Sequence, residues 1–582
     1  MTLVKDKQRL VTIFLAALVQ GLSLYGLYWA NAHQVWPATQ PIWGIPLLLL
    51  AAGLPTAIQL SADLDRRHMA RLLLPLIAIA LVIGISAAVA LADSHDVWSS
   101  GNHVFTLYFS SLVLGFTVLP FLQVWSDRQQ QGKLYPQLFS RAWQNTLLLA
   151  ETAFFTGVFW LILLLWGALF NVIKIRVFSE LFAEPVFIVP ITALAAGGAM
   201  YLAQTREAIA LVLRKHWLGI TAWLLPLIGF IALLFIASLA GTGLEPLWRT
   251  GKATFLMLWM VALLIKLSNS AYQDGEREVP YPAWLQAALR LALLTMPVFV
   301  GLCGYALWLR IAQYGWSVER IWAVFITAIA ACYAIGYALA ALVRQQGRWM
   351  HWIGRVNIVA AGLTIAGLLG LLSPLLSPQR IAAKTQEQRL LAGKVKAAEF
   401  DFWALRFNDG KYGLEVLRRL EQLDAHPEKE AIVAQAKEAL TNKNRYDRMQ
   451  KKIDWKDRLR VHPAGSAIPP GLLAYLNQDD NEYRINPGCY RLSTDQLCDL
   501  IQVDLNNDGQ PDWVILGEGQ GAVLAQQGDN WKLLGWLNFR GKLPNAEILQ
   551  KLLEQKGYKT VTPQYRDLML GGLRLRLTPA ED

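Results

Sequence analysis

The chain has 582 residues, of which 54% are hydrophobic and 17% are charged, and its formal net charge is +11. Soluble globular proteins average about 45–50% apolar and about 25% charged residues, so the composition excludes a purely soluble enzyme, a disordered scaffold and a disulfide-dense secreted toxin. Residues 1–378 carry 24 Lys and Arg against 15 Asp and Glu, and because these basic residues lie between apolar runs, they indicate membrane topology and not nucleic-acid binding.

Eleven apolar runs before residue 378 are long enough to be membrane-spanning helices, since about 20 apolar residues cross the hydrocarbon core of a bilayer. The predicted spans are residues 10–30, 43–60, 69–91, 105–125, 146–173, 185–204, 217–240, 254–272, 284–309, 321–343 and 356–372. The second is interrupted by Pro55, and the eighth carries Lys266. The sequence therefore predicts a mostly α-helical, polytopic membrane bundle over residues 1–378.

Lys and Arg are unevenly divided between the loops on the two sides of this bundle. With the N-terminus inside, sixteen of them lie in inside segments and six in outside loops. Cytoplasmic loops carry the excess of basic residues, so the N-terminus is predicted to be cytoplasmic. An odd number of spans then places the tail after residue 373 in the periplasm, with the bundle in a bacterial inner (cell) membrane.

Polar side chains within the predicted spans are candidates for function, because a charged group in a span costs about 2.5–3.5 kcal/mol on insertion scales. The candidates are Glu151, Lys266, Asn269 and Arg290, while Arg355 and Asn357 open the last span. Most of these groups lie near a predicted inner end, where long side chains reach the interface. Pairing Glu151 with Lys266 or Arg290 is the sharpest arrangement, and it would serve either as an ion-coupling site or as a clamp between helices.

The loop between the ninth and tenth spans places two arginines around an aromatic turn. Its residues Arg310, Tyr314, Trp316 and Arg320 are candidates for gripping the phosphate of a lipid headgroup. The alternative is an ordinary interfacial belt of aromatic residues with arginine anchors.

The tail has the composition of a soluble protein. Residues 379–460 are predicted to form a helical juxtamembrane segment, with Leu414, Leu417 and Leu420 on one helix face. Residues 461–480 include HPAGSAIPPG and are predicted to be a linker. Residues 481–582 contain short strand-like runs and one predicted helix, which indicates a small α+β domain.

The stretch DLNNDGQPD in this domain has the spacing of a calcium loop. Oxygen-bearing side chains fall at its positions 1, 3, 5 and 9, which are Asp504, Asn506, Asp508 and Asp512. Position 6 is a glycine, and Gln510 at position 7 would offer its backbone carbonyl. Calcium binds 6–8 oxygen ligands. The loop lacks the Glu of an EF-hand at position 12, and it resembles the DxNxDGxxD loops of FG-GAP and related repeat modules. A structural calcium ion is the prediction, and a polar hairpin turn without an ion is the alternative.

Two cysteines of the tail, Cys489 and Cys498, are predicted to form a disulfide that closes a short loop, provided that the tail lies in an oxidising compartment. The alternative is two unrelated thiols. Cys303 and Cys332 fall within spans and are interpreted as small apolar packing residues.

Several strings occur together in a characteristic order: LFNVIKIRVFSELF, NSAYQDG, RIAQYGWSVERIWA and KVKAAEFDFWALRFNDGKYGLEVLRRL. With them, the chain resembles the bacterial inner-membrane family of domain of unknown function 4153. The resemblance implies a polytopic inner-membrane protein with a soluble tail, and it implies no reaction.

Three functions remain open at this stage. The leading hypothesis is a non-enzymatic envelope protein whose bundle anchors a calcium-stabilised periplasmic domain that binds a protein partner, in sensing, assembly or envelope maintenance. The second is a transporter or lipid handler that uses the polar residues of the bundle. The third is a membrane enzyme acting on a lipid-linked substrate, with Asp93 and Asp96, among the first outer loops, as candidate acids.

Overall fold

The protein is described from a computed structural model, which covers residues 2–91, 101–126, 133–245, 253–275, 280–343, 350–442, 455–463, 465–478, 498–505, 507–516, 520–528, 530–538, 552–555, 568–570 and 573–575. The chain divides into two compact units, Met1–Thr441 and Asn442–Asp582. The first unit is helical in all its described elements, and the second is built on a five-stranded sheet.

Eleven helices of the described chain are long and apolar enough to cross a membrane, which confirms the predicted number of spans. They are α1 (Thr2–Ala32), α2 (Pro41–Leu60), α3 (Arg66–Ala90), α4 (Gly101–Ser126), α5 (Leu134–Val172), α7 (Pro185–Thr205), α8 (Glu207–Thr242), α10 (Ala253–Tyr272), α11 (Ala283–Leu293) continued by α12 (Met296–Tyr314), α13 (Val318–Leu342) and α14 (Ile353–Leu371). Prolines lie inside several of them, including Pro55 in α2, and spanning helices tolerate such prolines because neighbouring groups satisfy the freed backbone.

The fifth span is longer than predicted. Helix α5 has 39 residues and begins at Leu134, twelve residues before the predicted start at 146. At 1.5 Å per residue, such a helix is roughly 58 Å long, well beyond the ~30 Å hydrocarbon core. Its first turns are therefore a continuation of the helix beyond the apolar core, and the short α6 (Val177–Leu181) packs Phe178 against Trp166 near its other end, with 5.1 Å between the ring centroids.

The apolar cores of the bundle differ in the helices that they join. One core contains Ile13, Leu72 and Leu148 among helices α1 to α5 and α7, and a second contains Leu264, Phe299 and Tyr337 among α8 and α10 to α14. A further core, which includes residues 83, 114 and 368, connects α3 and α4 to α14. Helices α1 and α7 pack closely, because a Cβ added at Gly21 would stand 2.7 Å from the Cα of Pro190. Small residues at such a contact permit the backbones of spanning helices to approach.

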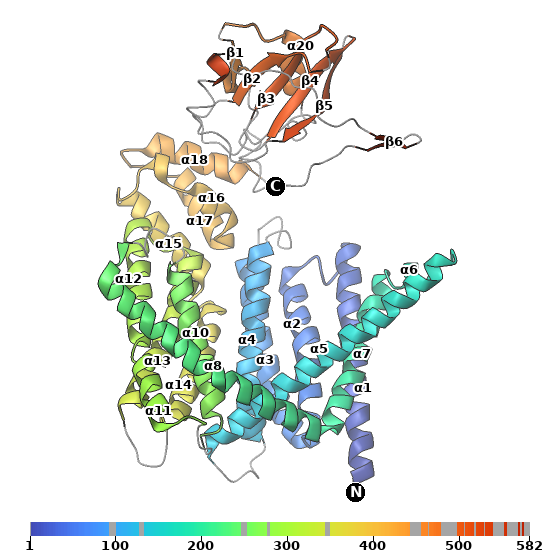
Figure 1. Cartoon of the computed structure of the whole chain (residues 1–582), viewed down its shortest axis with the longest axis vertical. Coiled ribbons are helices and arrows are strands. Elements are labelled where there is room, and N and C mark those ends of the chain that lie inside the picture. The colour runs from blue at the N-terminus through green and yellow to red at the C-terminus, as the bar shows by residue number, and fades with distance from the viewer. Residues whose placement is uncertain are drawn as a thin grey trace. The chain divides into compact units, whose positions relative to one another are not determined.

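A layer of short helices follows the last span, at the end of the bundle opposite the N-terminus (Figure 1). It consists of α15 (Pro378–Leu391), a 3₁₀ turn (Ala397–Glu399), α16 (Phe402–Phe407), α17 (Gly410–Glu421) and α18 (Lys429–Thr441). The predicted leucine face of α17 is buried here, with Leu417 fully enclosed against Ile432 and Phe402. The layer contacts the bundle directly, because the start of α17 at Gly410 lies against the carbonyl of Ala90 at the end of α3.

The second unit contains the predicted small α+β domain. Strands β1 (Leu459–His462), β2 (Cys498–Val503), β3 (Asp512–Leu516), β4 (Gln520–Gln527) and β5 (Asn530–Asn538) form the sheet in this order. Strand β1 is parallel to β2, and the other pairs are antiparallel. Strands β6 (Leu568–Leu570) and β7 (Leu573–Leu575) form a separate pair, and the short helices α19 (Trp455–Arg458) and α20 (Pro470–Leu476) complete the described elements.

The boundary between the units differs from the expected one. The predicted linker at 461–480 supplies α20, whose Leu472 and Leu476 are fully buried in one core with Trp513 and Leu500 of the sheet. The helices before Thr441 belong to the first unit. Prolines and glycines in HPAGSAIPPG suggested a linker, but the apolar side chains that follow them pack into the sheet.

Candidate functional site beside α15

The turn between α12 and α13 brings together the four residues predicted to grip a lipid headgroup. Helix α12 ends at Tyr314, and Gly315 follows with a positive φ of 76°, a conformation that glycine adopts without strain. The hydroxyl of Ser317 then accepts a hydrogen bond from the backbone N–H of Arg320 and so caps α13. The guanidinium groups of Arg310 and Arg320 both lie over the ring of Tyr314, 5.8 and 5.4 Å from its centroid.

Two side chains of helix α15 donate hydrogen bonds to backbone carbonyls of this turn. Gln386 donates hydrogen bonds to the carbonyls of Tyr314 and Trp316, at 3.0 and 2.7 Å. Arg389 donates to the carbonyls of Ala312 and Gln313, at 3.5 and 2.8 Å. These carbonyls are at the C-terminal end of α12, which carries partial negative charge and favours a cation. The aliphatic stem of Arg389 rests against Gly315, where an added Cβ would stand 2.6 Å from its Cδ.

An open cavity of about 270 Å³ lies between the turn and α15. Trp316, Arg389 and Lys394 contribute to its lining. Sequence reasoning identified the residues of the turn and missed Arg389 and Lys394. The available signal was the position of α15, which begins at Pro378 shortly after α14 ends at Leu371 and so returns its charged residues to the membrane interface.

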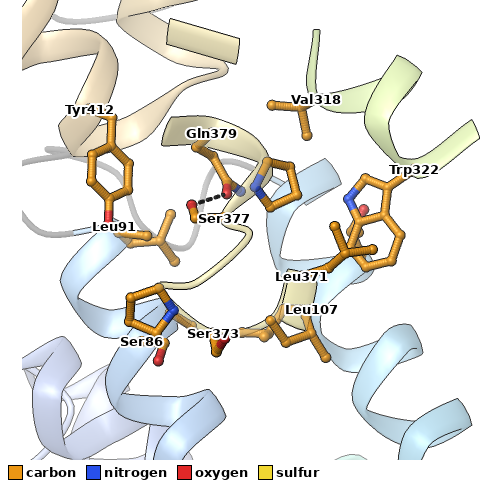
Figure 2. Close-up of a pocket in the computed structure, with 16 residues that line it drawn as sticks. Ser86, Leu91, Leu107, Val318, Trp322, Leu371, Ser373, Ser377, Gln379 and Tyr412 are labelled. Carbon is orange, nitrogen blue, oxygen red and sulfur yellow. Dashed lines mark hydrogen bonds between the residues drawn. The ribbon is translucent and has the colours of Figure 1, made fainter. Parts of the chain in front are cut away.

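A second pocket in the first unit is smaller and mostly apolar (Figure 2). Its walls include Leu107, Trp322 and Leu371 from three spans, and Tyr412 of α17 closes another side. The hydroxyl of Ser377 donates a hydrogen bond to Gln379 at 3.2 Å at its edge. The volume of about 80 Å³ is far below the roughly 300–1,000 Å³ of small-molecule sites, and we assign no ligand to it.

Asn269 is the one intramembrane candidate that the structure places in a polar network. The side-chain amide of Asn357 donates to Asn269 at 2.6 Å and to the Tyr135 hydroxyl at 2.8 Å, and it accepts from the Tyr337 hydroxyl at 2.7 Å. Asn357 belongs to α14, and its three partners, Asn269, Tyr135 and Tyr337, belong to α10, α5 and α13 respectively. Three hydrogen bonds at one amide thus connect four helices.

The other intramembrane candidates are not brought together. Among the described residues, Glu151 forms no ion pair with Lys266 or Arg290, and one carboxylate oxygen of Glu151 is buried without a hydrogen-bond partner. The Nε of Arg290 is likewise buried without a partner, whereas Lys266 is exposed on α10. The proposed pairing of Glu151 with either cation is therefore not seen.

A second amide network was missed by the sequence reasoning, which considered mainly charged groups. Gln123 and Asn145 exchange hydrogen bonds between α4 and α5, and Gln123 also donates to Ser61 at 2.9 Å. Gln204 of α7 donates to the carbonyl of Gln59 at 2.7 Å. Amide side chains recurring in otherwise apolar runs were the available signal.

The predicted calcium loop connects β2 to β3. The carboxylate of Asp504 accepts hydrogen bonds from the backbone N–H groups of Asn507 and Gly509, at 2.7 and 2.9 Å, and Asp512 accepts from Leu505 at 3.0 Å. Asn506 lies outside the described residues. No three His, Cys, Asp or Glu side chains of the described chain are arranged to hold a metal ion. The order of residues in the loop is that of a calcium site. In the structure, the carboxylates of Asp504 and Asp512 accept hydrogen bonds from backbone N–H groups and so stabilise the turn.

Of the two cysteines predicted to form a disulfide, the structure describes one. Cys498 is buried at the first position of β2, and Cys489 lies outside the described residues. Asp499, which sequence reasoning did not select, is 7% exposed and accepts from Arg460 at 2.7 Å while it contacts His462 at 2.8 Å. This group lies on the parallel pair β1–β2, and it holds the two strands together by charge.

The eleven apolar spans, with interfacial arginines and polar networks between the helices, define a multi-pass membrane protein that associates with a lipid bilayer. A family model described as domain of unknown function (DUF4153) matches residues 45–412. The chain belongs to this family, as its sequence strings predicted. The match begins within α2, includes the later spans and the arginines beside α15, and ends before the sheet unit. No curated protein and no solved structure matches the chain.

Proposed function

We propose that the chain is an inner-membrane protein of the bacterial envelope that presents its second unit in the periplasm for binding a partner, in sensing, assembly or envelope maintenance. The observation that carries the proposal is the odd number of spans between the N-terminus and a unit with its own apolar core. The excess of Lys and Arg in the segments assigned to the inside supports a cytoplasmic N-terminus.

The topology is tested by fusing a reporter to Asp582. A periplasm-active phosphatase should be active there, and a cytoplasm-active fluorescent protein should be dark. The matched control is the same pair of reporters fused after Asp65, between α2 and α3, where the opposite pattern is expected. Fluorescence from the fusion at Asp582 would overturn the periplasmic placement and, with it, the disulfide.

Within this proposal, a disulfide between Cys489 and Cys498 and a structural calcium ion stabilise the second unit. Cys498 is buried, and the free thiols among the described cysteines are Cys303 and Cys332. Intact-mass measurement of the alkylated protein, with and without reductant, tests the bond. Calcium titration of the full chain tests the ion, with Asp508→Ala, which removes the side-chain oxygens at position 5, expected to abolish binding and the exposed Asp424→Ala expected to leave it unchanged.

The partner surface is tested by cross-linking in cells. Leu534 and Trp536 are exposed on β5, 45% and 38% respectively, and β5 is an edge of the sheet. Single replacements of these residues by alanine should change the set of captured periplasmic proteins, compared with an alanine at Leu244 in the first unit. An unchanged set would count against an interaction role for this face.

A second candidate function, binding of a lipid or transport across the membrane, is favoured by the arginine cluster beside α15. The third candidate, a membrane enzyme, rested on Asp93 and Asp96, and both lie outside the described residues.

A further inference from the structure

Four cationic side chains gather around one aromatic turn at the end of the bundle that carries α15. Arg310 and Arg320 flank the ring of Tyr314, Arg389 lies against Gly315, and Lys394 lines the adjoining cavity. Arg320 is within electrostatic range of both Arg310 and Arg389. Like charges in this range repel one another, and an anion bound between them would offset that repulsion.

The acidic side chains nearby do not neutralise the cluster. Glu387 of α15 is held by Arg419, through hydrogen bonds of 2.9 and 2.7 Å. Glu319 is within electrostatic range of Arg320. In the described chain, however, no ion pair within 4.0 Å involves Arg310, Arg320, Arg389 or Lys394.

The hydrogen bonds to the turn leave donors unused. Arg320 donates through one terminal nitrogen to the carbonyls of Tyr314 and Gly315. Arg389 donates through both terminal nitrogens, and its Nε is buried with no partner among the described residues. A planar guanidinium offers five N–H groups in a fork that matches the oxygens of a phosphate.

The cavity has the size and place of a headgroup site. Its volume of about 270 Å³ approaches the roughly 300–1,000 Å³ of small-molecule sites. It lies beside Gly315, between the end of one span at Tyr314 and the start of the next at Val318. Span ends are at the depth of lipid phosphates, and basic pockets between spanning helices bind phosphorylated headgroups.

We propose that this cavity binds the phosphate group of an anionic ligand, with Arg389 and Lys394 as its cationic lining and with Arg310 and Arg320 beside Tyr314 on the adjoining turn adding positive charge. The phosphate comes from a phospholipid headgroup or from inorganic phosphate. The inference does not depend on the proposed envelope role; it specifies the second candidate function by naming a phosphate as the group that is bound. It holds for either orientation of the chain, because both leaflets and both aqueous phases offer phosphate.

The test uses two cations that the turn does not need. The side chains of Arg310 and Lys394 form no hydrogen bond within the described chain, so Arg310→Gln with Lys394→Gln keeps the hydrogen bonds from Gln386 and Arg389 to the turn. The exposed Lys384→Gln on the same helix is the matched control, since it removes one charge away from the cavity. Calorimetry of the full chain in detergent measures binding of dihexanoyl phosphatidylglycerol, inorganic phosphate, and dihexanoylglycerol, which has the same acyl chains and no phosphate.

We expect phosphatidylglycerol or inorganic phosphate to bind with an affinity that falls as salt is raised, and dihexanoylglycerol not to bind. Basic side chains near a membrane surface attract anionic groups strongly enough that losing two lowers affinity by about thirtyfold. The control should retain wild-type affinity. Binding of the lipid without competition by inorganic phosphate identifies a headgroup, whereas equal competition identifies free phosphate. Absence of binding by both phosphate probes, or an equal loss in the Lys384→Gln control, would overturn the proposal.

Discussion

Replacing Asn357 with leucine should weaken the packing of four spanning helices without a large change in volume. The Asn357 amide makes hydrogen bonds of 2.6, 2.8 and 2.7 Å to Asn269, Tyr135 and Tyr337. Hydrogen bonds between spanning helices average about 0.6 kcal/mol in double-mutant cycles, with a maximum of about 1.7. Three such bonds predict a loss of about 2 kcal/mol in the free energy of unfolding.

The assay is equilibrium unfolding of the full chain in mixed micelles of mild detergent and dodecyl sulfate. A double-mutant cycle of Asn357→Leu with Tyr337→Phe isolates one bond of the three, because the phenylalanine removes only the donating hydroxyl. The expected coupling free energy is about 0.6–1.7 kcal/mol. Thr364→Val on the same helix is the control, since its hydroxyl bonds only within α14. A coupling near zero, or a loss no greater than that of the control, would refute the reasoning.

Three further predictions concern other parts of the chain. Gly315→Ala should lower the thermal midpoint of the first unit, because φ is +76° and the new Cβ would meet Arg389, whereas Gly301→Ala on the same span has open space and should be tolerated; equal effects would contradict this. Burial beside the carboxylates of Glu319 and Asp401 raises the pKa of Asp409 well above its ordinary value of 3.8. The folded chain thus holds this proton more tightly than the unfolded chain, so its contribution to stability is complete at low pH and is lost as pH rises from about 4 through the raised pKa. Asp409→Asn should therefore reduce the loss of stability with rising pH and make the chain more stable than wild type at pH 8. Thermal midpoints measured from pH 4.5 to 8 test this, and a variant less stable than wild type at pH 8 would contradict it. Asp499→Asn should loosen strands β1 and β2 by about 2 kcal/mol, the value of hydrogen bonds to a buried charged group, and hydrogen exchange of these strands measures it; protection equal to wild type would count against the role of this carboxylate.

The spans were predictable because their signal is local: a run of about 20 apolar residues has few alternatives to crossing a bilayer. The start of α5 was not, since the residues from Leu134 to Asn145 mix apolar and polar types and only the structure shows that the helix continues through them. The boundary of the second unit depended on α20, which is placed by contacts with strands far along the chain.

The turn of the candidate site could be predicted from the sequence, whereas the contribution of α15 could not. The turn from Arg310 to Arg320 has a visible pattern of arginines around aromatic residues. Arg389 contributes through contacts with carbonyls 76 and 77 residues earlier in the chain, and no local pattern reports a partner at that distance. In the bundle, Asn269 could be selected because an amide is unusual in a span, whereas the hydroxyls of Tyr135 and Tyr337 could not, since tyrosines are common at span ends.

The Asn357 network also has a consequence for how the protein is made. Tyr135 and Asn357 are separated by 222 residues, so at roughly 5–20 residues per second the ribosome needs about 10–45 s to add the second after the first. Asn357 belongs to the last span, and the network closes only after ten earlier spans have been inserted. Until then Asn269 of α10 and Tyr337 of α13 lack this partner, so a chain truncated before α14 would leave both polar groups in the membrane without it, as a sign of incomplete synthesis.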